Sequence, residues 1–169
     1  MNFFMLLCIT GHSAVVGKLE VSLNVLLQEN LIEKRWIQGI NPSAKIINMC
    51  DFNDYPTDKS IVEAIGDKDK ITAQTSFYNP MSSFYNRGIG TSCYSDKRNV
   101  LDQVRVTPSL LGESDTSWYF WKAGIFNLRH LYNKKGRNKG YSFRKFGGGK
   151  FTEGYSNHFA VYALIIKKQ

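Results

Sequence analysis

The sequence predicts a mixed α/β or α+β fold in which helices cover a β-sheet, and three observations support this prediction. Leucines repeat at helical spacing near the N-terminus, the later segments are short and β-prone, and the chain closes with an apolar run, Phe159 to Ile166. A helix followed by many strands is typical of sheets with covering helices. The 169 residues, 43% hydrophobic and 21% charged, suit one globular domain, so residues 1–169 are treated as a single domain.

The N-terminal part predicts a strand, a helix and a second strand. The apolar run from Met1 to Thr10 fits a signal-peptide core or a buried strand, and the absence of a positive segment before it favours the strand. The leucine repeat predicts an amphipathic helix from about Lys18 to Gln38. Gly39 is the expected C-terminal cap of this helix, and Asn41-Pro42 marks its stop. Ala44 to Cys50 then fits a short buried strand.

The middle and C-terminal parts predict shorter elements. Turn-forming residues fill Asp51 to Pro56, and a short helix is expected from Thr57 or Asp58 to Gly66. Four β-prone segments are expected to be strands: Thr75–Tyr78, Thr91–Tyr94, Val100–Val106 and Trp118–Phe126. The basic, glycine-containing stretch from Asn127 to Thr152 is expected to form a long exposed loop before the last strand.

The net charge of +8 is distributed unevenly. Residues 116–169 hold 11 basic residues and one acid, Glu153, whereas residues 1–115 hold 11 basic and 13 acidic residues. A basic field of this kind attracts polyanions such as nucleic acids or phosphate esters, and it equally suits a solvated loop without a partner. Aromatic and basic residues alternate between Tyr132 and Phe146, a composition that fits base stacking with phosphate binding or a loop with packed aromatics.

Simple counts exclude several classes of protein. No apolar run reaches the ~20 residues that a membrane-spanning helix needs. The three cysteines, Cys8, Cys50 and Cys93, lie far apart and form no paired motif, so they indicate neither a zinc ribbon nor a disulfide scaffold. The sequence does not decide the cellular compartment. The protein is cytoplasmic or, if its true start lies upstream of Met1, secreted.

Polar residues with catalytic chemistry stand next to the predicted strands. Asp51 and Asn53 follow a strand end, where a carboxylate suits Mg²⁺ or water and an amide suits a phosphoryl oxygen; an ordinary Asx turn is the alternative. Asp102 lies in an apolar strand, where its charge needs a partner, either His158 or a nearby basic side chain. His158 precedes the last strand and is suited to acid–base catalysis, or it is a surface histidine.

Three segments, taken in order, resemble the endonuclease/exonuclease/phosphatase superfamily, the DNase-like metal-dependent phosphodiesterases. These segments are KIINMCDFND, VLDQVRV and GYSNHFAVYALI. The family has a strand ending in Gly-Asp-x-Asn, a later apolar-Asp-apolar strand, and Ser-Asp-His before the last strand. The resemblance extends from Gly11 to the C-terminus. It implies a sandwich of two β-sheets flanked by helices, and it implies that the N-terminal half of the family domain is missing here.

The resemblance also implies roles for individual residues. Asp51 matches the aspartate near the water or the metal, and Asn53 matches the phosphate-contacting asparagine. Asp102 matches the aspartate that orients the terminal histidine, and His158 matches that histidine, which stabilises charge on the scissile phosphate or assists proton transfer. His12 matches a second active-site histidine.

Three positions depart from the family pattern. Cys50 replaces a glycine, and Gly11 replaces the asparagine expected before His12. Asn157 replaces an aspartate that assists with the metal or the water, so a carboxylate becomes a neutral amide. The family's early asparagine and metal-binding glutamate have no counterpart in the pattern of this chain.

The function that the resemblance implies is Mg²⁺-dependent hydrolysis of a phosphoester, with a nuclease as the leading form. Mg²⁺, or Mn²⁺ in its place, is expected at Asp51 and Asn157, where it is expected to be held weakly or to be absent. Nucleic acid or another phosphate ester is the expected substrate. The alternative is a non-catalytic remnant or a nucleic-acid-binding module that uses the basic C-terminal third. The departures predict little or no hydrolysis by this chain, and an uncovered apolar sheet face predicts self-association.

Overall fold

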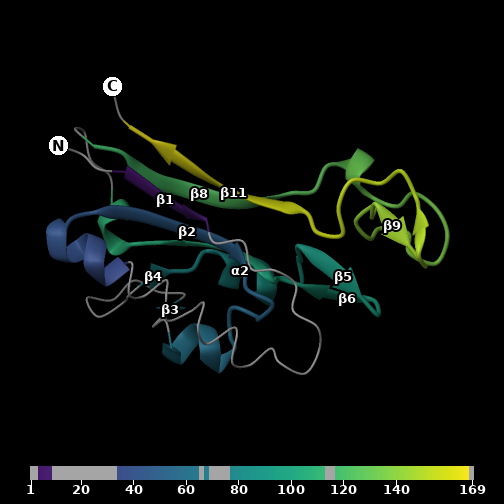
Figure 1. Cartoon of the computed structure of the whole chain (residues 1–169), viewed down its shortest axis with the longest axis horizontal. Helices are drawn as coiled ribbons and strands as arrows, with labels where there is room; N and C mark the ends of the chain where they lie inside the picture. The colour runs from purple at the N-terminus through teal and green to yellow at the C-terminus, as the bar shows by residue number, and fades with distance from the viewer. Residues whose placement is uncertain (1–3, 9–33, 65–66, 69–76, 113–116, 168–169) are drawn as a thin grey trace.

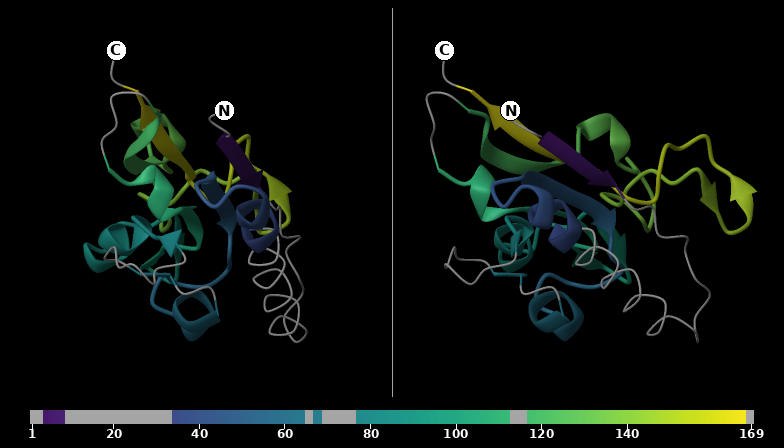
Figure 2. Two further views of the ribbon diagram at one scale, coloured as in Figure 1. Left: turned by 90° about the vertical axis from the view of Figure 1, so that its left-hand side faces the viewer. Right: turned by 60° about the vertical axis from the view of Figure 1, so that its left-hand side comes forward.

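The computed structural model describes residues 4–8, 34–64, 67–68, 77–112 and 117–167, and two β-sheets pack against each other in it (Figures 1 and 2). The larger sheet has the strand order β1-β2-β7-β4-β3, and the smaller sheet pairs β11 with β8. The bounds of these strands are β1 (Phe4–Cys8), β2 (Lys45–Asp51), β3 (Asp67–Lys68), β4 (Phe77–Tyr78), β7 (Asp102–Val106), β8 (Tyr119–Phe126) and β11 (Ala160–Ile166). The mixed α/β fold with two sheets agrees with the prediction.

Shorter elements complete the described part of the chain. Two small hairpins are formed by β5 (Ser92–Tyr94) with β6 (Lys97–Asn99) and by β9 (Phe146–Gly147) with β10 (Lys150–Phe151). Residues 34–40 are helical, and α2 spans Met81–Asn86. The remaining turns of helix are the π-helix η1 (Ser60–Ala64) and the 3₁₀ turns η2 (Pro108–Leu110) and η3 (Arg129–Leu131).

Strands β2 and β7 lie antiparallel beside each other, and the alternation of their side chains decides where polar groups go. The register pairs Ile47 with Val106 and Asp51 with Asp102. Because residues two apart share one face of a sheet, Ile47, Val104 and Val106 lie on the same face as the two aspartates. The apolar members of this face are buried in the core, while the aspartates stand at the end of the ladder.

The core between the two sheets fixes the position of β11. Its buried members are Ile47, Met81, Val100, Val104, Val106, Leu110, Ile125 and Phe159. Side chains of β8 and β11 pack against them, among them Phe120, Ala123, Val161, Ala163 and Ile165. Burial of apolar surface is the dominant favourable term in such packing, at roughly 25 cal/mol per Å². The segment that enters β11 is therefore held against the larger sheet.

The opposite face of the larger sheet is buried but partly polar. Arg105 is fully buried there and donates a hydrogen bond to Asn48 Oδ1 (2.8 Å). Gln103, also fully buried, accepts a bond from Asn79 Nδ2 and donates one to the backbone carbonyl of Asp54, both at 2.7 Å. Buried polar groups are retained where they are hydrogen-bonded. This face therefore holds the turn that follows β2.

Most predicted strands form with ends shifted by a few residues, but the predicted helix end is wrong. The helix at residues 34–40 continues past Gly39, so this glycine is not a cap. The last helical hydrogen bond runs from the Asn41 N–H to the Ile37 carbonyl (2.9 Å), and Pro42 then ends the helix. Residues 18–33 of the predicted helix lie outside the described part of the chain. The short helix predicted before Gly66 forms as η1 and begins later, at Ser60.

Two other expectations need correction. Residues 127–152 are not a plain loop, because η3, a bridge between Tyr132 and Ser142, and the β9–β10 hairpin give them structure. The apolar run from Phe159 to Ile166, which suggests a core strand, forms β11, but no residue of β11 itself is fully buried. Among the described strands it pairs only with β8, and one of its faces stays open. Among the described residues, no helix is long and apolar enough to cross a membrane.

The outer face of the β8–β11 sheet is apolar and exposed, and we expect it to make the chain self-associate. Phe126 is 47% exposed and Leu164 is 37% exposed. Exposed apolar patches of this kind promote association. Replacing both residues by threonine keeps the β-propensity of the strands and should lower the mean mass of the protein at equal concentration. Size exclusion with light scattering over a concentration series measures this mass.

The control is Phe151→Thr, which removes an aromatic ring that is even more exposed, at 60%, from the β9–β10 hairpin. This variant should retain the association of the natural chain. A natural chain that stays monomeric across the whole concentration series would show that the open face has no such effect.

Candidate functional site

Two aspartates face each other at the end of the β2–β7 ladder. Asp51 is the last residue of β2, Asp102 is the first residue of β7, and the two are direct cross-strand partners. Directly opposed residues in an antiparallel pair point to one face of the sheet, and like charges there are destabilising. A proton or a cation at this end of the ladder therefore stabilises the fold.

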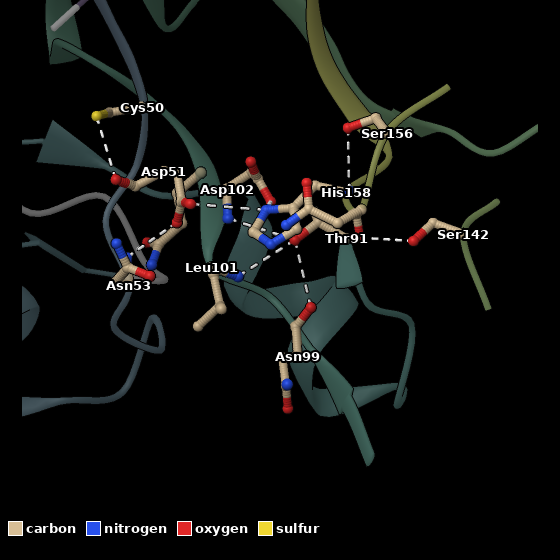
Figure 3. A network of polar contacts seen from close by, with 12 residues as sticks. Cys50, Asp51, Asn53, Thr91, Asn99, Leu101, Asp102, Ser142, Ser156 and His158 are labelled. Atoms are coloured by element: carbon tan, nitrogen blue, oxygen red, sulfur yellow. Dashed lines mark hydrogen bonds and ion pairs between the residues drawn. The ribbon is translucent and has the colours of Figure 1, made fainter. Parts of the chain in front are cut away.

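His158, which enters from the smaller sheet, supplies the partner that the aspartates need. Its Nδ1 lies 2.8 Å from Asp102 Oδ2 and 3.6 Å from Asp51 Oδ2 (Figure 3). The exposed fraction of the side chain is 21% for His158, 17% for Asp102 and 35% for Asp51. These three side chains are called the carboxylate–histidine cluster below. It is partly shielded and still open to a ligand.

A buried ring anchors the residue that follows His158. Phe159 is 1% exposed and belongs to the core between the sheets. Its ring packs against the ring of Tyr132, with the centroids 4.9 Å apart. The position of His158 is thus set by the packing of one sheet on the other.

The stretch before His158 is tied down as well. Ser142 Oγ donates a hydrogen bond to the carbonyl of Asn157 (2.5 Å). A Cβ atom on Gly154 would come within 1.9 Å of the carbonyl oxygen of Arg144, so only glycine allows this close approach of two backbones. Residues on both sides of the histidine therefore restrict its backbone.

Thr91 connects the backbone of Asp102 to the backbone segment that carries His158. It is fully buried, and its Oγ1 accepts backbone N–H bonds from Leu101 (3.2 Å) and Asp102 (3.3 Å). Its carbonyl accepts the N–H of Phe159 (2.7 Å), the residue after His158. Figure 3 shows Thr91 beside both partners. Through its hydroxyl and its backbone carbonyl, Thr91 therefore joins the start of β7 to the segment that enters β11.

In the turn after β2, the two carboxylate oxygens of Asp51 have different neighbours. Oδ1 accepts the backbone N–H of Asn53 (3.0 Å), which makes the Asx turn that the sequence allowed. Oδ2 is the oxygen nearest His158 Nδ1. Asn53 adopts a positive φ of 53°, a conformation that asparagine tolerates better than most residues, and its side chain is exposed.

The pKa values of Asp51 and His158 are shifted at this site. Burial raises the pKa of the Asp51 carboxyl, the Asp102 charge adds to this, and the Asn53 N–H and His158 oppose it. The hydrogen bond to Asp102 raises the pKa of His158, with the charges of Asp102 and Asp51 adding to the effect and burial and Arg144 opposing it. His158 therefore keeps its charge to a higher pH than a free histidine does.

The donor atoms present fit a divalent cation. One ligand atom from each member of the cluster lies within 4.8 Å of the others. Mg²⁺ prefers oxygen ligands, binds proteins through one or two carboxylates and retains several waters. Asp102 Oδ2 is engaged by His158, which leaves Asp51 Oδ2 as the best-placed carboxylate oxygen.

Three of the predicted site residues come together in the structure: Asp51, Asp102 and His158. Asn53 lies beside them with an exposed side chain, and Asn157 is exposed while its carbonyl accepts the bond from Ser142. His12 lies outside the described residues.

Reasoning from the sequence missed Thr91 and Gln103. Thr91 was predicted only as the first residue of a strand, and a threonine that accepts backbone N–H bonds has no distinctive sequence pattern. Gln103 carried a usable signal, because a polar residue between Asp102 and Val104 must lie on the other face of β7.

Comparison with protein-family models identifies a family that covers most of the chain. The model of a family described as the endonuclease/exonuclease/phosphatase family matches residues 25–167. None of the curated proteins compared matches the sequence.

Solved structures that match the chain include two from Bacteroides thetaiotaomicron and one human protein. A mannosyl-6-phosphatase is 15% identical, with a TM-score of 0.48 over 96% of this chain and 51% of that one. An endonuclease/exonuclease/phosphatase family protein is 17% identical, with a TM-score of 0.48 over 96% and 50%. The human Nocturnin catalytic domain with bound sulfate is 12% identical, with a TM-score of 0.42 over 95% and 47%. The chain spans about half the length of these structures.

The hydrogen bond in the cluster predicts the titration of His158. In Asp102→Asn the largest cause of its raised pKa is removed, so the pKa of His158 should fall, whereas Asp96→Asn on the β5–β6 turn should leave it unchanged. The imidazole C–H resonances followed by NMR across the pH range measure this value. An unchanged titration of His158 in Asp102→Asn would mean that the two side chains do not pair in solution.

Because the hydroxyl of Thr91 accepts two backbone N–H bonds, we expect two substitutions of Thr91 to differ in their effect on stability. Thr91→Val keeps the shape of the side chain but leaves two half-buried N–H groups without their acceptor, which should lower the free energy of unfolding by about 1–3 kcal/mol. Thr91→Ser retains the hydroxyl and should lose clearly less. Urea denaturation of the three proteins measures the difference, and equal losses in the two variants would exclude a role for the hydroxyl.

Proposed function

The chain belongs to the endonuclease/exonuclease/phosphatase family, and from this premise we propose that it is a metal-assisted phosphoester hydrolase that reacts at the carboxylate–histidine cluster. The observation that carries this proposal is the 2.8 Å contact of His158 Nδ1 with Asp102 Oδ2 beside a second carboxylate, Asp51. A carboxylate that orients a histidine recurs in hydrolytic sites because it fixes the tautomer and stabilises the imidazolium.

In this proposal His158 acts on the phosphoryl group through Nε2, because Nδ1 is engaged by Asp102. The raised pKa keeps a larger share of the ring protonated near neutral pH. An imidazolium N–H donates to a phosphoryl oxygen whose negative charge grows in the transition state. Removing one preorganised donor of this type lowers the rate by roughly 10²–10³-fold in well-studied enzymes.

Asp51 is the residue proposed to hold the divalent cation, and the exposed amide of Asn53 is proposed to contact the phosphoryl group. When bound, the cation supplies Lewis-acid stabilisation of charge on phosphoryl oxygens. Asn157 offers a neutral amide where a carboxylate would add charge. The cation is therefore held weakly, and the reaction is slow.

A second candidate function, nucleic-acid binding without turnover, is favoured by one observation. Residues 116–169 carry 11 basic residues against one acid. A surface of this charge binds polyanions with an affinity that falls steeply as salt is added. Binding that is salt-sensitive, together with no hydrolysis, would support this candidate in place of the first.

We expect the chain to hydrolyse bis(4-nitrophenyl) phosphate slowly and only with Mg²⁺ or Mn²⁺. His158→Ala should reduce the rate about 100-fold or more, because it removes the donor and the proton carrier together. Asn157→Asp should change the rate by less than about tenfold, because one added carboxylate does not complete a cooperative site.

Asp96→Asn is the matched control for these measurements, since it neutralises an exposed carboxylate on the β5–β6 turn. Its rate should equal that of the natural chain. Metal-dependent hydrolysis that survives in His158→Ala, or no metal-dependent hydrolysis at all, would contradict the proposed function.

A further inference from the structure

A cavity separate from the cluster lies within the basic stretch that connects β8 to β11. Its volume is about 760 Å³. It is lined by Leu128, Arg129, His130, Tyr132, Asn133, Lys134, Lys139 and Gly140. Three of these side chains carry a permanent positive charge, and none carries a negative one. The lining is thus suited to an anion.

The walls of this basic cavity are held by hydrogen bonds. The backbone N–H of Asn133 donates to the Tyr141 carbonyl (2.8 Å), and the N–H of Gly140 donates back to the Asn133 carbonyl (2.9 Å). The side-chain amide of Asn133 donates to the Ser142 carbonyl (3.0 Å). These bonds close the stretch between Tyr132 and Ser142 into a defined loop, so the cationic side chains start from fixed positions.

The positively charged side chains that line the cavity have no acidic residue close to them in the sequence. From Leu128 to Lys150 the sequence holds eight basic residues and no acid. Within the described ranges, no ion pair with a carboxylate involves Arg129, Lys134 or Lys139. Unneutralised cations gathered around a hollow raise the local concentration of anions.

The basic cavity lies at the same end of the β8–β11 sheet as the cluster. Its loop leaves β8 at Phe126, which pairs with Ala160, and His158 stands two residues before that partner. Tyr132, in the cavity wall, packs on Phe159, the residue that follows His158. Figure 1 shows the loop extending from this end of the sheets.

From this placement we propose that the basic cavity binds a backbone phosphate of a nucleic-acid strand, a phosphate other than the one at His158. This inference rests on the proposed function for the role of the cluster, but the binding it predicts needs no turnover. The volume is larger than one phosphate requires, which suits a nucleotide unit within a chain. The exposed rings of Phe146 and Phe151, whose centroids lie 5.6 Å apart in the same stretch, offer faces on which bases stack.

The test compares two double variants that remove the same charge from the same loop. Lys134→Gln with Lys139→Gln changes the cavity lining, whereas Lys135→Gln with Arg137→Gln removes two exposed charges outside it. Binding of a fluorescein-labelled twelve-nucleotide single strand is measured by fluorescence anisotropy in EDTA, over a range of salt concentrations.

The cavity variant should bind the strand about tenfold more weakly. The slope of log K against log salt concentration, where K is the binding constant for the strand, should be shallower by roughly 0.7 for each phosphate that the variant no longer neutralises. The control variant should bind less than about threefold more weakly than the natural chain. Equal weakening in the two variants would assign the binding to the general basic field and overturn the proposal, as would unchanged binding in both.

Two further arms separate the sources of the phosphate. Unlabelled strand should displace the probe at concentrations where inorganic phosphate and a mononucleotide do not; equal displacement by the mononucleotide would overturn the assignment to a strand. The second arm measures metal-dependent hydrolysis by the natural chain beside its binding of the probe. Retained strand binding in a chain without hydrolysis would leave the basic cavity supported and the proposed function refuted.

Discussion

The whole site depends on the placement of two aspartates opposite each other at the end of one β-ladder. The register that buries Ile47 and Val106 in the core also pairs Asp51 with Asp102. The sheet cannot separate these carboxylates without shifting its apolar face, because a slip by one residue turns every side chain over. The repulsion is therefore offset from outside the sheet, and His158 of the other sheet is the residue that offsets it.

This arrangement makes the chemistry of the cluster a consequence of how the two sheets pack. Phe159 places the histidine by filling the shared core, and Thr91 ties the backbone of Asp102 to the backbone of Phe159. Neither residue is proposed to react, yet both help to determine where His158 lies. The chain segment that leads into β11 also forms the basic cavity. The carboxylate–histidine cluster and the basic cavity are therefore both positioned by the segment between β8 and β11.

The strands were predictable because apolar residues alternate or run together over short segments, as they do from Val104 to Val106 and in the last strand. The meeting of Asp51, Asp102 and His158 followed from the order of motifs that resembles the family; it depends on strand register and sheet packing, which no local pattern encodes. The helix end was wrong at Gly39 because one glycine in a last helical turn costs only about 1 kcal/mol, so the proline that follows decides the stop.

The central claim is that Asp102 and His158 form one coupled unit, and a double-mutant cycle on the free energy of unfolding tests it most directly. Asp102→Asn, His158→Gln and the double variant are compared at pH 6 and at pH 9. Because the folded-state pKa of His158 is raised, its stabilisation is present in full below the unfolded value of about 6.5 and declines as the pH rises through the folded value. The account predicts a coupling of about 1 kcal/mol or more at pH 6 and a smaller one at pH 9. Additive losses at pH 6 would contradict it.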